Sequence, residues 1–193
     1  MSSRPFILRP ADRQPALKVI GTQVAVLASE PEIEDQHITA QSGDEGTGPP
    51  PHSHDWDESF YVTKGQVGFT CGGETAMCTA GTLVHVPAGT VHAFRYGPGG
   101  GEILEITGKR SHAIAMFTAL DREIPPGPPD LAKVIQVLGE HGVTVHLSCG
   151  VLKNSSGSAG AEREPRADRR PRDRHGPARR TPRTCTSQTG SGS

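Results

Sequence analysis

Short runs of β-branched, aliphatic and aromatic residues alternate with glycine- and proline-rich segments over the first 110 residues. These runs recur about every ten residues, which predicts short strands in an all-β sandwich or barrel. Connections of this length favour antiparallel pairing, because parallel crossovers need about a dozen residues or more. The expected strands cover residues 16–20, 23–28, 37–41, 59–63, 66–71, 74–79, 83–86, 91–96 and 102–107.

The hydrophobic period changes after Gly108. Residues 112–120 are apolar, with a pattern that fits either a strand or a helix. The segment IPPGPPD then interrupts the chain, and Asp130 is positioned to cap a helix over residues 131–140. Apolar residues at helical spacing would share one face of that helix: Leu131, Val134, Ile135 and Leu138. We expect this helix to cover one end or edge of the sheet.

The C-terminal segment differs sharply in composition. Residues 155–193 contain no Val, Ile, Leu, Met, Phe, Tyr or Trp, but they hold nine of the fifteen arginines. Four acids oppose these arginines, so the segment has a formal charge of +5, and the overall −1 leaves −6 for residues 1–154. A segment without apolar side chains cannot offset its ordering entropy by burial, so we expect disorder.

A basic arm for nucleic acid or an anionic membrane is one interpretation of this tail. The alternative, which we prefer, is a passive tail. Acids and prolines interrupt the arginines, no aromatic residues interleave, and the composition resembles the product of a reading-frame slip. The acidic remainder of the chain also disfavours nucleic acid as a partner.

The length of 193 residues suits one domain. We expect an N-terminal arm over residues 1–15 and a barrel over residues 16–110. An apolar segment with a helix would follow over residues 111–153, and a disordered tail rich in Arg, Pro, Ser and Gly over residues 154–193. No signal peptide pattern stands at the N-terminus, and no apolar run approaches the length of a membrane span. The four cysteines lack CxxC spacing, and a hairpin turn at Gly72-Gly73 would leave Cys71 and Cys78 out of register. These features favour a reducing cytoplasm without disulfides or membrane contact.

The stretch GPPPHSHDWDESF, residues 48–60, carries the candidate chemistry. His52 and His54 alternate with period two, so both point to one face of an extended strand, and Glu58 keeps that parity. His92 follows the Pro87-Ala88-Gly89 turn, from which an adjacent strand could carry it back to the same place. Three imidazoles and one carboxylate suit one divalent transition metal: Fe, Mn, Ni, Co, Cu or Zn.

The spacing of these residues resembles the cupin superfamily. Its first motif corresponds to Gly46-x5-His52-x-His54-x3-Glu58-x6-Gly65, and its second to Gly81-x5-Pro87-x-Gly89-x2-His92. Fifteen residues separate Gly65 from Gly81, a compact spacing similar to that of small bacterial cupins. The second motif usually ends in Asn, where this chain has Tyr96. That Asn is a turn residue, so the departure leaves the proposed metal ligands intact.

The resemblance implies a double-stranded β-helix, or jelly-roll barrel, with a metal held inside by His52, His54, Glu58 and His92. Glu58 would also be the catalytic base. Four aromatic residues would contact substrate: Trp56, Phe60, Phe94 and Tyr96. Strand parity would place Phe60, Phe94 and Tyr96 on the same face as the ligands, and Trp56 would lie at the barrel mouth. For Phe60, ordinary barrel core is an equally good interpretation.

The runs over residues 52–65 and 80–94, followed by a Pro-rich link to a helix ending in GEHGV, are similar to bacterial proteins called quercetin-dioxygenase-like. We therefore expect a dioxygenase-type oxidoreductase acting on a small enolic or phenolic compound. Two alternatives stay open: an isomerase or lyase using the metal as a Lewis acid, and a metallocupin that binds a small molecule without turnover. We also expect a homodimer, because the apolar residues Phe6, Ile7 and Leu8 lie together in the N-terminal arm.

Overall fold

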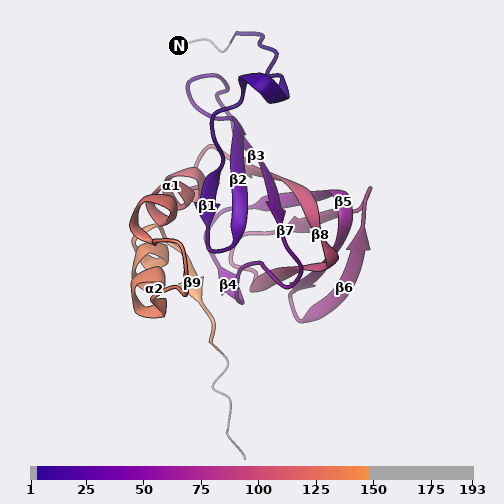
Figure 1. Ribbon diagram of the computed structural model, residues 1–193, viewed down its shortest axis with the longest axis vertical. Helices are drawn as coiled ribbons and strands as arrows, with labels where there is room; N and C mark the ends of the chain where they lie inside the picture. The colour runs from indigo at the N-terminus through magenta and orange to yellow at the C-terminus, as the bar shows by residue number, and fades with distance from the viewer. Residues whose placement is uncertain (1–3, 148–193) are drawn as a thin grey trace, which may run out of the picture. The chain divides into compact units, whose positions relative to one another are not determined.

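The computed structural model describes residues 4–147, and strands dominate its architecture (Figure 1). Nine strands within these residues form one curled sheet in which every pairing is antiparallel. They are β1 (Leu17–Val19), β2 (Thr22–Ala28), β3 (Gln36–Gly43), β4 (His52–Ser53), β5 (Glu58–Cys71), β6 (Glu74–Thr79), β7 (Leu83–Val86), β8 (His92–Gly108) and β9 (Thr144–Val145). The predicted all-β, jelly-roll fold class is confirmed.

Two long strands organise the sheet. The order β1-β2-β3-β8-β4-β9 forms one path, and β5 pairs with β6, β7 and β8. The sequence predicted a break near Gly65 and another after Tyr96, but β5 and β8 each continue as one strand. The expected interruptions appear instead as irregularities of register in the β5–β8 pairing, between Val62 and Lys64 and between Gly65 and Val67.

Gly65 shows why one of these irregularities needs glycine. Its φ is +72°, a conformation that side chains disfavour, and a Cβ there would clash with the backbone carbonyl of Gly100. The close approach lets β5 bend while it stays paired with β8. Gly81 and Gly89, the glycines of the second motif, also have positive φ.

The hairpin at Gly72-Gly73 forms in the predicted register. Cys71 lies opposite Glu74, and Val67 lies opposite Cys78. The two cysteines are therefore not cross-strand partners, and both are free. This confirms the expected absence of a disulfide between them.

Two α-helices follow the barrel: α1 (Ala113–Glu123) and α2 (Leu131–Glu140). They lie together on the side of the sheet near β1 and β9 (Figure 1). The ambiguous segment 112–120 therefore belongs mostly to a helix. The Asp130 side chain accepts hydrogen bonds from the backbone N–H groups of Ala132 and Lys133, which confirms the predicted cap. A short 3-10 turn, Pro10–Asp12, precedes the barrel.

The predicted buried face of α2 is partly wrong. Val134 and Leu138 are buried, but Leu131 is 68% exposed and Ile135 is 41% exposed. Val137, fully buried, takes their place. The stripe is rotated because α2 packs against α1 and β9 rather than lying flat on the sheet. No helix within residues 4–147 is both long and apolar enough to cross a membrane.

The buried apolar residues form two clusters. The barrel cluster lies between strands and includes Phe60, Phe69, Phe94, Tyr96, Val62, Val67 and Ile103. The helix cluster joins the two helices to Val24 and Trp56 at one side of the barrel. The predicted tail, residues 154–193, lies outside the described residues.

Candidate metal centre

Three strands bring the candidate ligands to one place. His52 begins β4, Glu58 begins β5 and His92 begins β8. His52 and His92 are direct cross-strand partners, so the sheet itself sets their separation. His54 follows β4 and is 6% exposed.

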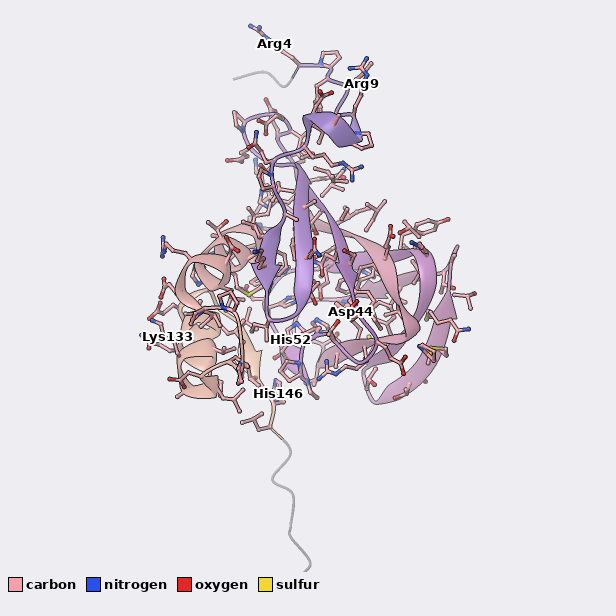
Figure 2. All side chains as sticks on the ribbon, viewed as in Figure 1. Arg4, Arg9, Asp44, His52, Lys133 and His146 are labelled. Carbon is pink, nitrogen blue, oxygen red and sulfur yellow. The ribbon has the colours of Figure 1, made fainter. Side chains whose placement is uncertain are left out.

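The strand that carries His52 is also held from its other edge. β9 pairs with β4, with His52 opposite Val145. Ser53 Oγ is 2.8 Å from His146 Nε2, and the backbone N–H of His146 donates to the carbonyl of Pro51. Figure 2 shows His52 and His146 at the same end of the molecule's described part. β9 was not among the expected strands, because two residues are too short to produce a recognisable alternation.

The four donor groups converge. Ligand atoms of His52, His54, Glu58 and His92 all lie within 4.8 Å of one another. Glu58 Oε1 is 3.1 Å from His54 Nε2 and 2.6 Å from His92 Nε2. Glu58 is 5% exposed and His92 is 1% exposed, so water contributes little to solvating these groups.

The second nitrogen of each imidazole fixes its tautomer. Nδ1 of each histidine lies 2.9 Å from a backbone carbonyl oxygen: Pro50 for His52, Trp56 for His54 and Thr90 for His92. A carbonyl can only accept, so each Nδ1 must donate its proton. In the neutral imidazole, each Nε2 then presents a lone pair. Outer hydrogen bonds of this kind orient the histidine ligands of metal sites.

This donor set fits a cation. Three Nε2 lone pairs and a carboxylate face one another, and no donor among the four groups satisfies them when the imidazoles are neutral. The contact between His92 Nε2 and Glu58 Oε1 lacks hydrogen-bond alignment, and this nitrogen is buried without a hydrogen-bond partner. Imidazole and carboxylate ligands suit divalent transition metals. The cluster is therefore able to hold one metal ion.

The electrostatics of the cluster also favour a cation. Burial, and next the nearby His92, lower the pKa of His52 to about 4, so His52 is neutral near pH 7. Burial alone would raise the pKa of Glu58, but its close contacts with the imidazoles of His54 and His92 outweigh burial and lower it to about 2. Burial opposes a charge on His92, yet the contact with Glu58 raises its pKa. A proton and a metal ion compete for that same lone pair.

Trp56 packs against the cluster. Its ring stacks on His54 with centroids 4.0 Å apart and planes 4° apart, and His112 lies 6.1 Å away in a nearly parallel plane. It is 6% exposed and belongs to the helix cluster. The only tryptophan of the chain therefore fixes one imidazole and joins the site to α1.

A cavity of about 120 Å³ extends from this cluster towards the helices. His52, His54 and Glu58 form part of its lining, together with three of the four predicted substrate residues: Trp56, Phe60 and Phe94. Residues of both helices supply an apolar wall: Ala113, Met116, Phe117, Leu120, Val134 and Leu138. This lining role of the helices was not predicted, because only the three-dimensional arrangement brings them to the barrel.

Tyr96 has a different place. It belongs to the barrel cluster, 2% exposed, and the cavity lining does not include it. Its backbone N–H donates to the carbonyl of Thr47 and its carbonyl accepts from Gly46, so it holds the loop before the first histidine. The residue at the usual Asn position thus anchors this loop through its backbone.

Sequence reasoning missed Glu105 and Gln41, which also line the cavity. In GEILEITG the apolar Leu104 and Ile106 suggest an inward face, yet Ile103, Glu105 and Thr107 are the buried residues. The sequence did contain one signal: if Ile103 faces the barrel interior, strand alternation places Glu105 in the interior as well.

The comparisons with known proteins agree with this architecture. Residues 41–106 match the Cupin_2 family, described as a cupin domain. Over 53 residues the chain is 38% identical to the uncharacterized protein SCO3923 of Streptomyces coelicolor, covering 28% of this chain and 50% of that protein. The chain thus matches only half the length of this curated relative.

Solved structures show the same fold. KdgF from Halomonas sp. superposes with a TM-score of 0.52 at 19% identity, covering 57% of this chain and 99% of that one. An RmlC-like cupin from Shewanella frigidimarina NCIMB 400 superposes with a TM-score of 0.52 at 18% identity, covering 59% and 99%. At such identities the likeness establishes the fold alone. Within residues 41–106 the family match and the fold agree on a cupin domain, and the histidine–glutamate cluster there could hold one metal ion.

Proposed function

We propose that this protein is a metal-dependent cupin enzyme, a dioxygenase-type oxidoreductase that acts on a small enolic or phenolic compound. One observation carries the proposal: three imidazole nitrogens and a carboxylate converge at the end of a largely apolar cavity. Such a cavity with a few convergent polar groups is the usual form of a small-molecule site.

The residues of the site would have different chemical roles. A divalent metal bound by His52, His54, Glu58 and His92 would lower the pKa of a coordinated hydroxyl group. Glu58 is ionised near neutral pH and lies beside the imidazole nitrogens that would hold the metal, so its carboxylate can accept that proton. Trp56 and the helix wall keep bulk water from the reacting group.

The decisive experiment combines metal analysis with a substrate screen. The full chain, purified without chelator, is analysed for bound metals, and small enolic and phenolic compounds are then offered under air and under nitrogen. We expect one metal ion per chain and conversion that consumes O₂. Conversion that is equal under nitrogen would support the isomerase or lyase alternative. Binding without conversion would support a non-catalytic metallocupin.

We further propose that the protein works in the reducing cytoplasm as a homodimer with a small-molecule substrate. Free Cys71 and Cys78 suit a reducing compartment. Two apolar surfaces could contact a second copy. Phe6 and Ile7 of the N-terminal arm are 47% and 79% exposed. On the outer sheet face, cross-strand pairing makes an apolar row from Ala40, Leu104, Tyr61 and Leu83.

Light scattering distinguishes these surfaces. The full chain should be a dimer at micromolar concentration. If the arm forms the interface, deletion of residues 1–10 should produce monomers. If the outer face forms it, Leu83→Glu should produce monomers, because the new carboxylate would be buried against apolar groups. A monomeric full chain would contradict the proposal.

A further inference from the structure

A second buried carboxyl lies inside the barrel, apart from the four candidate ligands. Glu105 is 3% exposed, and none of the ion pairs found within residues 4–147 involves it. A carboxyl in such a place is costly unless hydrogen bonds or protonation compensate. Neither the proposed metal site nor the barrel packing accounts for it.

Two neighbours hold this carboxyl from one side. Gln41 Nε2 donates to Glu105 Oε2, and Thr39 Oγ1 lies 3.4 Å from the same oxygen. Both contacts end on Oε2, and the side chain lines the cavity. Oε1 is therefore the oxygen available to a ligand there. Burial, and next the charge of Glu58, raise the pKa of Glu105, which favours a neutral acid able to donate a hydrogen bond.

The sheet register relates Glu105 to the metal cluster. Glu58 of β5 lies opposite Thr107 of β8. Glu105 precedes Thr107 by two residues, so both lie on the same face of β8. Diagonal neighbours of this kind have Cα atoms about 7–8 Å apart. A ligand bound at the histidines can therefore reach Glu105 only through a second oxygen a few bonds away from the first.

The cavity volume limits the carbon skeleton. The cavity holds about 120 Å³. A protein cavity of about 150 Å³ accommodates benzene. One six-membered ring is thus close to the limit, whereas a three-ring flavonol requires much more space. The apolar wall of Met116, Phe117 and Leu120 suits the hydrocarbon part of such a ring.

We propose that Glu105 is a specificity-determining residue of this site, and that the site takes a one-ring or equally compact ligand with two oxygen functions a few bonds apart. One oxygen faces the histidine cluster, and the other receives a hydrogen bond from Oε1 of Glu105. Gln41 and Thr39 act as positioning residues, because they hold the carboxyl from behind. This inference rests on the proposed function for the role of the metal cluster.

Calorimetric titration of the zinc-loaded full chain tests the inference, because zinc has no redox chemistry and binding is measured without oxidation. The probes are phenol with one oxygen, resorcinol and hydroquinone with two separated oxygens, and the three-ring flavonol quercetin. We expect resorcinol or hydroquinone to bind about tenfold or more tightly than phenol, the effect of one buried hydrogen bond. Quercetin should bind more weakly than either.

Variants assign the preference to its residue. Glu105→Leu should reduce the two-oxygen preference to near one, and Glu105→Gln, which keeps a donor, should retain most of it. If the Glu105→Leu chain fails to fold, Gln41→Leu gives the same test, because it releases the carboxyl. An unchanged preference in the variant tested, equal binding of quercetin, or no binding of the two-oxygen probes would overturn the inference. Glu105-dependent binding by the zinc-loaded chain, together with no turnover in air by the chain purified with its own metal, would instead overturn the dioxygenase function alone.

Discussion

The cavity lining holds two buried glutamates, Glu58 at the histidine cluster (the histidine end) and Glu105 beside Gln41 and Thr39 (the Glu105 end), and the two carboxyls differ in ionisation. Imidazole nitrogens surround Glu58, and they lower its pKa to about 2 in spite of its burial. An amide and a hydroxyl contact Glu105, and burial raises its pKa well above the usual value. Both side chains are at most 5% exposed, so the neighbours decide the outcome rather than the burial.

This difference indicates separate chemical roles within one barrel. Two titratable groups whose surroundings move their pKa values apart are suited to opposite tasks, one accepting a proton and the other donating a hydrogen bond. The histidine end is arranged for a cation, and the Glu105 end is arranged for a neutral contact.

The largest expected effect follows from breaking the histidine end. His54→Ala should lose most of the bound metal, because one of the three converging imidazoles disappears. Zinc at about one hundred times its dissociation constant should stabilise the native protein by about 2.7 kcal/mol, and the variant by much less. Metal analysis and thermal unfolding with and without zinc measure this. His85→Ala is the control, since His85 is exposed and contacts Ser59. An equal loss of metal in the control would contradict the site.

The second prediction concerns how the stability of the metal-free protein depends on pH. The pKa of Glu58 is lowered, so its contribution is present above about pH 4.5 and is lost as the pH falls towards about 2. The pKa of Glu105 is raised, so its contribution is present below about pH 4.5 and is lost as the pH rises through the folded-state value.

Denaturant unfolding from pH 2 to pH 8 checks these opposite signs. Glu58→Gln should remove the acid-side loss of unfolding free energy, which is a few kcal/mol at most (~3 kcal/mol for a shift of this size). Glu105→Gln should reduce the loss on the alkaline side. If both variants changed the pH profile in the same direction, the comparison between the two carboxyls would be wrong.

The third prediction tests the wall that both ends share. Asp130→Ala removes the cap of α2 and should lower the unfolding free energy by about 1 kcal/mol. The metal affinity should stay nearly unchanged, because no ligand lies on this helix. Asp44→Ala is a matched exposed control. A large loss of metal in Asp130→Ala would show that the helix wall positions the histidines.

The smallest effect is expected outside the described residues. Truncation after Lys153 should leave the thermal transition and metal content nearly unchanged, because residues 155–193 offer no large apolar side chain to bury. Thermal unfolding and metal analysis of the truncated chain check this. A marked loss of stability would indicate that the arginines contact the acidic remainder of the protein.

Much of the histidine end was predictable, and the Glu105 end was not. His52, His54, Glu58 and His92 follow fixed intervals set by strand parity and turn positions, so spacing alone brings them together. Glu105 lies in a run where apolar residues occupy both faces of β8, so alternation points the wrong way. The contribution of α1 to the cavity wall and the pairing of β9 with β4 depend on tertiary packing, which local periodicity does not encode.

The pairing of β9 with β4 also sets an order of assembly during synthesis. His52 emerges early from the ribosome, yet the strand opposite it on one edge, Thr144–Val145, is made more than ninety residues later. At about 5–20 residues per second, the nascent barrel spends several seconds without that partner. The strand that carries His52 thus gains its second partner only when the far end of the described chain is made, so a ribosome pause between α1 and β9 would prolong the time that this strand spends without it.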